Sequence, residues 1–340
     1  MENQSMLYVL VLSGLSDLPS HQLPLFLVFL LVYLMTLTGN LLIVLLICTD
    51  SHLQTPMYFF LGTLACLDMG YSSVIIPRML FDFYMQRRQI TIHCCITQFY
   101  FFIVFAVSEV LLLAVMSYDR YVAICRPLHY TQIMHWKFCV VIVSIVFTFS
   151  FIYPLVHVLF LLKLSFCNSS TLQSFFCDLP QLLLASCSDT SINVFLILFC
   201  GILLVITFLP LTFCPYIFIL NTIMKFKSNA MRSKAFSTCS SHLTVVFIFY
   251  GTVSFNYFHP NAYNHFTEER VFSVFYAVLT PLLNPLIYSL RNQELKLSLQ
   301  RALLHLVAKL RPKCTESACN KLSFLLQHLK GLFTYVRPAT

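Results

Sequence analysis

The chain has 340 residues, of which 59% are hydrophobic and only 10% are charged, and its mean hydropathy is +0.81. Soluble domains carry about 25% charged residues, so this composition excludes a soluble globular protein. The formal net charge is +8. Because the apolar residues fall in long blocks, we expect a polytopic membrane protein whose basic residues face anionic lipid and not nucleic acid.

Seven apolar blocks are long enough to cross a bilayer, which needs about 20 residues per helix. They lie at about 23–48, 57–80, 96–120, 138–162, 193–220, 237–258 and 270–290. The blocks are continuous and do not alternate as the strands of a membrane barrel do, so they predict helices. The seventh contains Pro281, Asn284 and Pro285, which a membrane helix tolerates because neighbouring groups satisfy the freed carbonyls. We predict an all-α membrane protein, a seven-transmembrane helix bundle.

The basic residues orient this bundle. One lies at the end of the third block and two follow it, four lie between the fifth and sixth, and nine follow the seventh, together sixteen of the 21 Lys and Arg residues. The positive-inside rule makes that side cytoplasmic and leaves the N-terminus extracellular. Asn3 and Asn168 then begin glycosylation sequons on the outer side. We expect an extracellular segment at 1–22, the bundle at 23–290, a short cytoplasmic amphipathic helix at 291–310 and a disordered cytoplasmic tail at 311–340.

Five cysteines fall on the outer side, where disulfides form and persist. Cys94 and Cys95 lie at the start of the third block, and Cys167, Cys177 and Cys187 lie in one outer loop. These residues are disulfide candidates whose pairing the spacing leaves open. A metal site that includes His93 beside Cys94 and Cys95 is the alternative that we do not favour.

Asp119 and Arg120 stand next to each other where the third block ends. Charged residues at a hydrocarbon edge are rare unless they have a role, because insertion at the bilayer centre costs about 2.5–3.5 kcal/mol per charge. The pair could act as a breakable latch that grips a neighbouring helix, or as a plain ion pair beside the headgroups. Asp68 and Glu109 lie deeper, and such acids pair, become protonated or hold a cation.

Several motifs carry a resemblance to a known family. Asp119-Arg-Tyr121 and Asn284-Pro-Leu-Ile-Tyr288 resemble the motifs of rhodopsin-like G-protein-coupled receptors. The finer pattern is similar to the olfactory receptor branch of the tetrapod type. It consists of Gly39-Asn40-Leu-Leu-Ile43, Thr55-Pro-Met-Tyr-Phe-Phe-Leu61, Met116-Ser-Tyr-Asp-Arg-Tyr-Val-Ala-Ile-Cys125, Lys234-Ala-Phe-Ser-Thr-Cys-Ser-Ser-His-Leu-Thr244, Phe249-Tyr-Gly-Thr252 and Pro281-Leu-Leu-Asn-Pro-Leu-Ile-Tyr-Ser-Leu-Arg-Asn292.

The resemblance implies an odorant receptor in the plasma membrane, expected in the cilia of olfactory neurons. It implies a small, mostly apolar volatile ligand and a heterotrimeric G protein of the stimulatory, olfactory class that raises cyclic AMP. A receptor of the same fold used outside the nose is the near alternative. A transporter would need repeated halves with broken helices, which we do not find. We expect no enzyme, because no nucleophile-base set stands out.

The resemblance also assigns roles to residues. Together with helical spacing on the third block, it predicts the ligand-binding residues Phe102, Ile103, Ala106, Val107, Cys200, Leu204, Val253, Asn256, Tyr257 and Ala277. Ordinary helix packing is the alternative for each of them. The implied residues for switching and G-protein coupling are Asp119, Arg120, Tyr121, Tyr216, Asn284, Pro285 and Tyr288. A buried polar pocket of Asn40, Asp68 and Glu109 would hold a sodium ion near the two acids.

By the same resemblance, the disulfides are expected to be Cys95–Cys177 and Cys167–Cys187. Cys66 and Pro215 depart from the family pattern, since serine is commoner at both positions, and so does Gln54, where histidine is commoner. The extra proline could bend the fifth helix. The segment beyond about 311 is longer than the tail that is usual in this family, and it is either a real extension or an artefact of gene prediction.

Overall fold

The computed structural model describes residues 9–15, 18–166, 171–226, 228–258 and 273–310. The long helices are α1 (Pro19–Thr49), α2 (Pro56–Met85), α3 (Ile92–Cys125), α5 (Trp136–Leu161), α7 (Ser191–Met224), α8 (Asn229–Phe258), α10 (Thr280–Arg291) and α11 (Gln293–Leu310). Shorter helices are η1 (Ser51–Leu53), η2 (Pro127–His129), α4 (Tyr130–Ile133), α6 (Leu179–Leu184) and the π-helix η3 (Phe275–Leu279). The strands are β1 (Val9–Leu12), β2 (Gln89–Thr91) and β3 (Thr171–Leu172).

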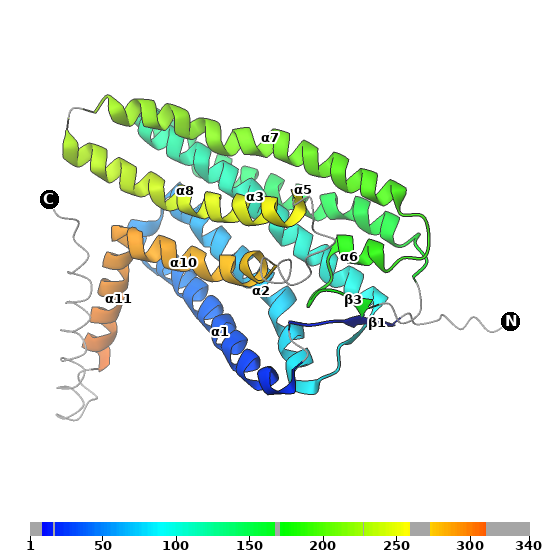
Figure 1. Cartoon of the computed structure of the whole chain (residues 1–340). Coiled ribbons are helices and arrows are strands. Elements are labelled where there is room, and N and C mark those ends of the chain that lie inside the picture. The colour runs from blue at the N-terminus through cyan, green and yellow to red at the C-terminus, as the bar shows by residue number, and fades with distance from the viewer. Residues whose placement is uncertain (1–8, 16–17, 167–170, 227, 259–272, 311–340) are drawn as a thin grey trace.

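The architecture is the predicted seven-helix bundle, followed by α11, which turns sharply away from the direction of α10 (Figure 1). Five helices within the described residues, α1, α2, α3, α5 and α7, are long and apolar enough to span a membrane. The sixth and seventh contribute the shorter apolar segments His242–Gly251 and Ala277–Tyr288. The start of the predicted seventh block lies outside the described residues.

The long helices extend a few residues beyond the predicted apolar blocks, because backbone hydrogen bonding continues after the hydrocarbon ends. Local residues set several of these ends. Pro19 and Pro56 occupy first-turn positions, where proline loses no helical hydrogen bond. The Thr91 side chain accepts a hydrogen bond from the backbone N–H of Cys94 and so caps α3. Gln86 ends α2 with a φ of 53°.

Helix α3 lies at the centre of the bundle. It contacts α2, α5, α7 and α8, while α1 packs on α2 and α10. Helix α7 is different, because it is apolar on every side and buries few residues. Within α7 the buried residues are Asn193, Thr212, Tyr216, Ile219 and Ile223. Most of α7 therefore faces outward, where lipid solvates apolar side chains.

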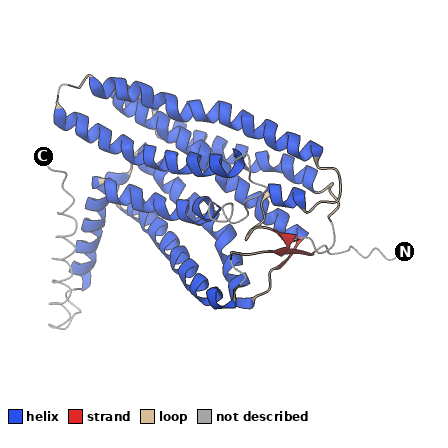
Figure 2. Cartoon of the chain, in the orientation of Figure 1, coloured by secondary structure: helices blue, strands red, loops and turns tan. Residues whose placement is uncertain are grey.

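A small sheet, absent from our sequence-based expectation, lies at the outer end of the bundle (Figure 2). Its strand order is β2-β1-β3, with β1 antiparallel to β2 and parallel to β3. The fully buried Leu10 and Leu12 of β1 join an apolar cluster with Phe99 of α3 and Leu182 of α6. Strand β1 thus packs on the outer ends of α3 and α6.

The predicted Cys95–Cys177 disulfide is confirmed. It joins α3 to the outer loop across 82 residues of sequence, with the two Cα atoms 5.4 Å apart. Cys94, the neighbouring candidate, is free and exposed. Cys187 is disulfide-bonded, but Cys167 lies outside the described residues, so their pairing stays a prediction. The sequons at Asn3 and Asn168 also lie outside them.

Replacing Cys177 with serine is expected to lower the free energy of unfolding by about 2–4 kcal/mol, because the disulfide restricts the unfolded chain. Thermal unfolding of the purified protein and its surface expression measure the effect. Cys94→Ser is the matched control and should leave both unchanged, since Cys94 is exposed and free. Equal losses in the two variants would show that this bond does not stabilise the fold.

Candidate functional site

An aromatic cluster occupies the outer half of the bundle, and we define it as Tyr71, Phe102, Phe175 and Phe176. The Phe102 ring centroid lies 5.3 Å from that of Tyr71 on α2 and 5.2 Å from that of Phe176 in the outer loop. The ring centroids of Phe175 and Phe176 are 5.0 Å apart. All four side chains are almost fully buried. The loop therefore lies over the bundle as a cover of aromatic rings.

The disulfide holds this cover in place. Phe176 directly precedes Cys177, whose sulfur is bonded to α3. The Cys177 backbone N–H also donates to Oε1 of Gln98 at 3.0 Å, and Nε2 of Gln98 donates to the carbonyl of Val74 at 3.0 Å. One glutamine thus links the loop, α3 and α2 directly below the cover.

The structure brings together only part of the predicted ligand-binding set. Phe102 and Ala277 are buried in one apolar cluster, against which the half-buried Ile103 and Ala106 pack. Val107 belongs to a separate cluster between α3, α5 and α7. Cys200 and Leu204 lie half-buried on α7 and belong to neither cluster. Val253, Asn256 and Tyr257 are residues of α8 whose side chains lie outside the described part of the structure.

Sequence reasoning missed Tyr71, Phe175 and Phe176. The signal for Phe175 and Phe176 was their position next to a loop cysteine expected to be bonded to α3. It also missed Gly70, which allows α2 to approach α3 closely. A β-carbon added at Gly70 would lie 2.5 Å from the ring of Phe105, closer than any normal carbon contact.

At the opposite end of α3, Asp119 is held by two partners and is almost fully buried. Nε of Arg120 donates to Oδ2 of Asp119 at 3.0 Å, and NH2 of Arg120 contacts the same oxygen. The Tyr130 hydroxyl donates to Oδ1 at 2.8 Å. Burial, together with the neighbouring Asp119 carboxylate, raises the pKa of Tyr130, so its hydroxyl keeps the proton that it donates. We call these three residues the latch.

The other predicted switch residues surround the latch at different distances from it. The hydroxyl of Tyr216 on α7 is hydrogen-bonded to Nδ1 of His242 on α8, and Tyr121 packs on Phe218 of α7 with ring centroids 5.9 Å apart. The Tyr288 hydroxyl is buried without a hydrogen-bond partner among the described residues. A buried hydroxyl without a partner is rare in folded proteins and calls for a physical explanation. Pro285 contacts α1 instead.

A polar pocket lies between the aromatic cluster and the latch. Nδ2 of Asn284 donates to Oδ1 of Asp68 at 2.9 Å and to Oε1 of Glu109 at 3.1 Å. We call Asp68 and Glu109 the acid pair, and both are buried. Asn40, predicted to join this pocket, donates instead to the backbone carbonyls of Thr36 and Pro281, at 3.0 and 3.1 Å. It joins α1 to the seventh helix beside the pocket.

Comparison of the sequence with known proteins identifies the family that this chain resembles. A sequence model of the family described as olfactory receptor matches residues 29–306. Olfactory receptor 5B12 of Homo sapiens is 46% identical over 296 residues, which cover 87% of this chain and 94% of that receptor. Olfactory receptor 5B21 of Mus musculus is 45% identical over 303 residues, which cover 89% and 95%.

Among solved structures, the chain is similar to the crystal structure of squid rhodopsin. The TM-score is 0.61 at 16% sequence identity, and the match covers 92% of each chain. At that identity the likeness shows the fold alone. The fold match and the sequence matches nevertheless agree on a seven-helix receptor architecture.

Gly70→Ala is expected to destabilise the fold by about 1–3 kcal/mol, because the added methyl group overlaps the ring of Phe105. Thermal unfolding of the purified variant measures this loss. Gly201→Ala is the matched control, since nothing lies within 4 Å of the β-carbon that it adds. Adding Phe105→Leu to Gly70→Ala should recover part of the stability. If the double variant were no more stable than Gly70→Ala, the overlap would not be the cause.

Proposed function

The chain belongs to the olfactory receptor family, and we propose that it binds small, mostly apolar volatile molecules within the bundle and activates a stimulatory, olfactory-type G protein. It is a multi-pass membrane receptor and not an enzyme. The observation that carries the proposal is the family match over residues 29–306, because it extends from the first span to α11. The proposed location is the plasma membrane of olfactory neuron cilia.

The chemistry around the aromatic cluster supports an apolar ligand. Phe102, Ala106 and Ala277 offer hydrocarbon surface, and no aspartate follows Phe102 on α3 until Asp119 at the far end. Beside Phe102, α3 therefore offers no aspartate to a cationic amine, and the next acid along α3, Glu109, already accepts a hydrogen bond from Asn284. An odorant of about 10–15 heavy atoms that gains about 0.5 kcal/mol per atom would bind with about 5–7 kcal/mol, hence at roughly 10 µM or weaker. Broad, weak recognition follows from these magnitudes.

Signalling would proceed by repacking of α7, α8 and the seventh helix around α3. The bound ligand can shift the receptor only by the difference in its affinity for the two conformations. The proposed change separates Arg120 from Asp119 and gives Tyr288 a hydrogen-bond partner. The freed guanidinium would then contact the G protein at the cytoplasmic end, and cyclic AMP would rise. The latch thus sets the energy that the ligand must overcome.

We further propose that the acid pair holds a sodium ion in the inactive receptor. Two carboxylates that share one amide donor repel each other when both are ionised in a low-dielectric site, so a cation or a proton must compensate them. Carboxylate and amide oxygens are the ligands that hard cations take. The Asp68 and Glu109 carboxylates fit this requirement, and Asn284, whose Nδ2 donates to both of them, would have to turn its amide to offer its oxygen. A bound cation would supply the positive charge that lets both acids stay ionised.

Arg120→Ala is expected to abolish odorant-dependent production of cyclic AMP while the receptor still reaches the cell surface. The reason is that the variant retains the bundle but loses the guanidinium that would face the G protein. A cyclic AMP reporter, normalised to surface labelling, measures the result. Arg126→Ala is the control, since Arg126 is exposed at the end of α3. Normal output from Arg120→Ala would contradict the role proposed for the latch.

Ala106→Phe tests the ligand site. If Ala106 faces ligand, the larger side chain fills part of the cavity, and the response to large odorants is lost before the response to small ones. If Ala106 only packs helices, the added ring costs about 1–3 kcal/mol of stability and weakens every response equally. Dose-response curves normalised to surface expression distinguish the two results.

Tyr257→Phe is the companion variant, because it removes one hydroxyl and keeps the size of the side chain. We expect it to weaken odorants that accept or donate hydrogen bonds by about 0.5–1.5 kcal/mol, while hydrocarbon odorants are unaffected. Equal losses for both ligand classes in Ala106→Phe and Tyr257→Phe would move the binding site elsewhere.

A further inference from the structure

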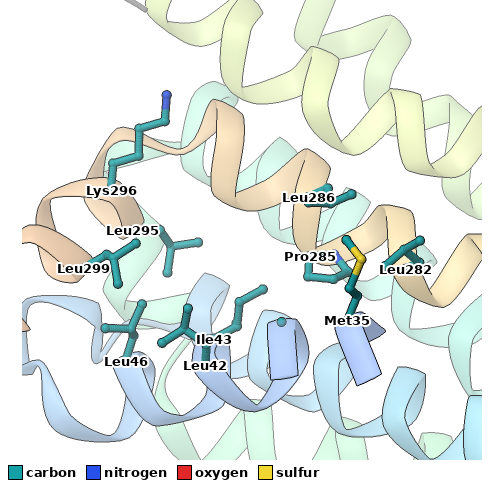
Figure 3. Close-up of a pocket in the computed structure, with 11 residues that line it drawn as sticks. Met35, Leu42, Ile43, Leu46, Leu282, Pro285, Leu286, Leu295, Lys296 and Leu299 are labelled. Atoms are coloured by element: carbon teal, nitrogen blue, oxygen red, sulfur yellow. The ribbon is translucent and has the colours of Figure 1, made fainter. Parts of the chain in front are cut away.

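A groove separate from the aromatic cluster lies where α1, α10 and α11 meet, with a volume of about 240 Å³. Ten of its eleven lining residues are apolar, and the remaining one is Lys296 on α11. Figure 3 shows the apolar side chains of α1 facing those of α10 and α11. Lys296 of α11 lies at one end of the groove, with its amine directed away from the apolar lining. We call this feature the α1–α11 groove.

The groove has a buried floor and an open side. Ile43, Leu46 and Leu295 form the floor and are 2–6% exposed, whereas Leu42 and Leu286 along the opening are 41% and 39% exposed. In a chain that spans a membrane, an exposed apolar opening beside a spanning helix such as α1 faces acyl chains and not water. The groove is therefore accessible from the bilayer.

Its length matches one leaflet. The lining residues on α1 run from Met35 to Leu46, eleven residues apart, which corresponds to about 16 Å at a rise of about 1.5 Å per residue. That distance is about half of a hydrocarbon core of roughly 30 Å. Because α11 follows the last span, on the side that the positive-inside rule makes cytoplasmic, the leaflet is the inner one.

Two cations on α11 differ in their partners. NH2 and Nε of Arg301 both donate to Oδ2 of Asp50 after α1, at 2.6 and 3.1 Å. These hydrogen bonds lower the pKa of Asp50 well below its ordinary value, so the ion pair persists and ties α11 to α1. Lys296, in contrast, forms no ion pair with any residue that the structure describes. The groove thus ends in a cation whose charge is not compensated within the described chain.

We propose that the α1–α11 groove binds a phospholipid with an acidic headgroup from the inner leaflet, with one acyl chain in the groove and the headgroup phosphate at Lys296. Inner-leaflet lipids carry the negative charge that juxtamembrane lysines attract. A lysine with its stem on apolar surface and its amine at the headgroups is the arrangement in which such a residue is stable. A sterol would leave Lys296 without a partner, because its single hydroxyl is neutral.

Lipid retention by the full-length receptor tests the proposal without odorant or G protein. The purified receptor is equilibrated with palmitoyl-oleoyl phosphatidylserine or with the matching phosphatidylcholine, and bound lipid is measured by native mass spectrometry. We expect phosphatidylserine to be retained more strongly. Lys296→Gln should reduce its retention about fivefold, the effect of one lysine near an anionic surface, and leave phosphatidylcholine unchanged. Lys137→Gln, at an exposed position at the start of α5, is the matched control.

A second pair of variants tests the acyl-chain part. Leu42→Trp fills the groove from an exposed position and should reduce retention of both lipids. Ile145→Trp should not, because Ile145 lies on α5, away from the groove, and its side chain is 60% exposed. A photoreactive acyl chain should label peptides of α1 and α11 in the unmodified receptor. The proposal would be overturned if Lys296→Gln retained phosphatidylserine as strongly as the unmodified receptor does. Displacement of phosphatidylserine by cholesterol to the same extent in both proteins would also overturn it. So would a bound mass that hydroxylamine removes, because hydroxylamine cleaves thioesters and the mass would then be a covalent acyl chain and not a bound phospholipid.

Discussion

Inside hydrocarbon there is no water to complete a hydrogen bond, so each buried polar group of this receptor needs a partner from the chain itself. The helices satisfy the backbone, and most buried polar side chains follow the same rule, although the Tyr288 hydroxyl has no partner among the described residues. Asn284 donates to both members of the acid pair, Asn40 donates to two carbonyls, and Asp119 accepts from two side chains. These contacts join helices that apolar packing alone would leave free to slide, because lipid is as apolar as leucine.

Helix α3 connects the places where these contacts occur. Cys95 and Asp119 are 24 residues apart, or about 36 Å along the helix. Phe102 and Glu109 lie between them. The loop that covers the bundle, the aromatic cluster, the acid pair and the latch are therefore all attached to α3. A change at the cover can reach the latch in two ways, by a shift of α3 as a unit or by repacking of the helices around it. The disulfide at its outer end favours the second, because it holds α3 to the loop.

The sequence was sufficient for the bundle and insufficient for the contacts between its parts. The apolar blocks predicted the spans because length and continuity alone identify a membrane helix. The sheet was missed because its strands have two to four residues, too few to show alternation. Tyr130 was missed because its contact with Asp119 crosses a turn that no periodicity describes. The two carbonyl contacts of Asn40 were not predicted, because a motif fixes a residue's position on its helix but not the direction in which its amide points.

The outward position of α7 has a thermodynamic consequence. Because α7 is apolar on every side and buries few residues, its movement exchanges contacts with lipid for contacts with protein, and little apolar surface meets water. The heat-capacity change that accompanies hydrophobic exposure should then be nearly absent from this movement. Its free energy is left mainly to side-chain hydrogen bonds between α7 and its neighbours, which include Tyr216 with His242, Thr212 with Tyr250 and Cys125 with Thr222. Such an equilibrium varies almost linearly with temperature, unlike the curved stability of a soluble domain.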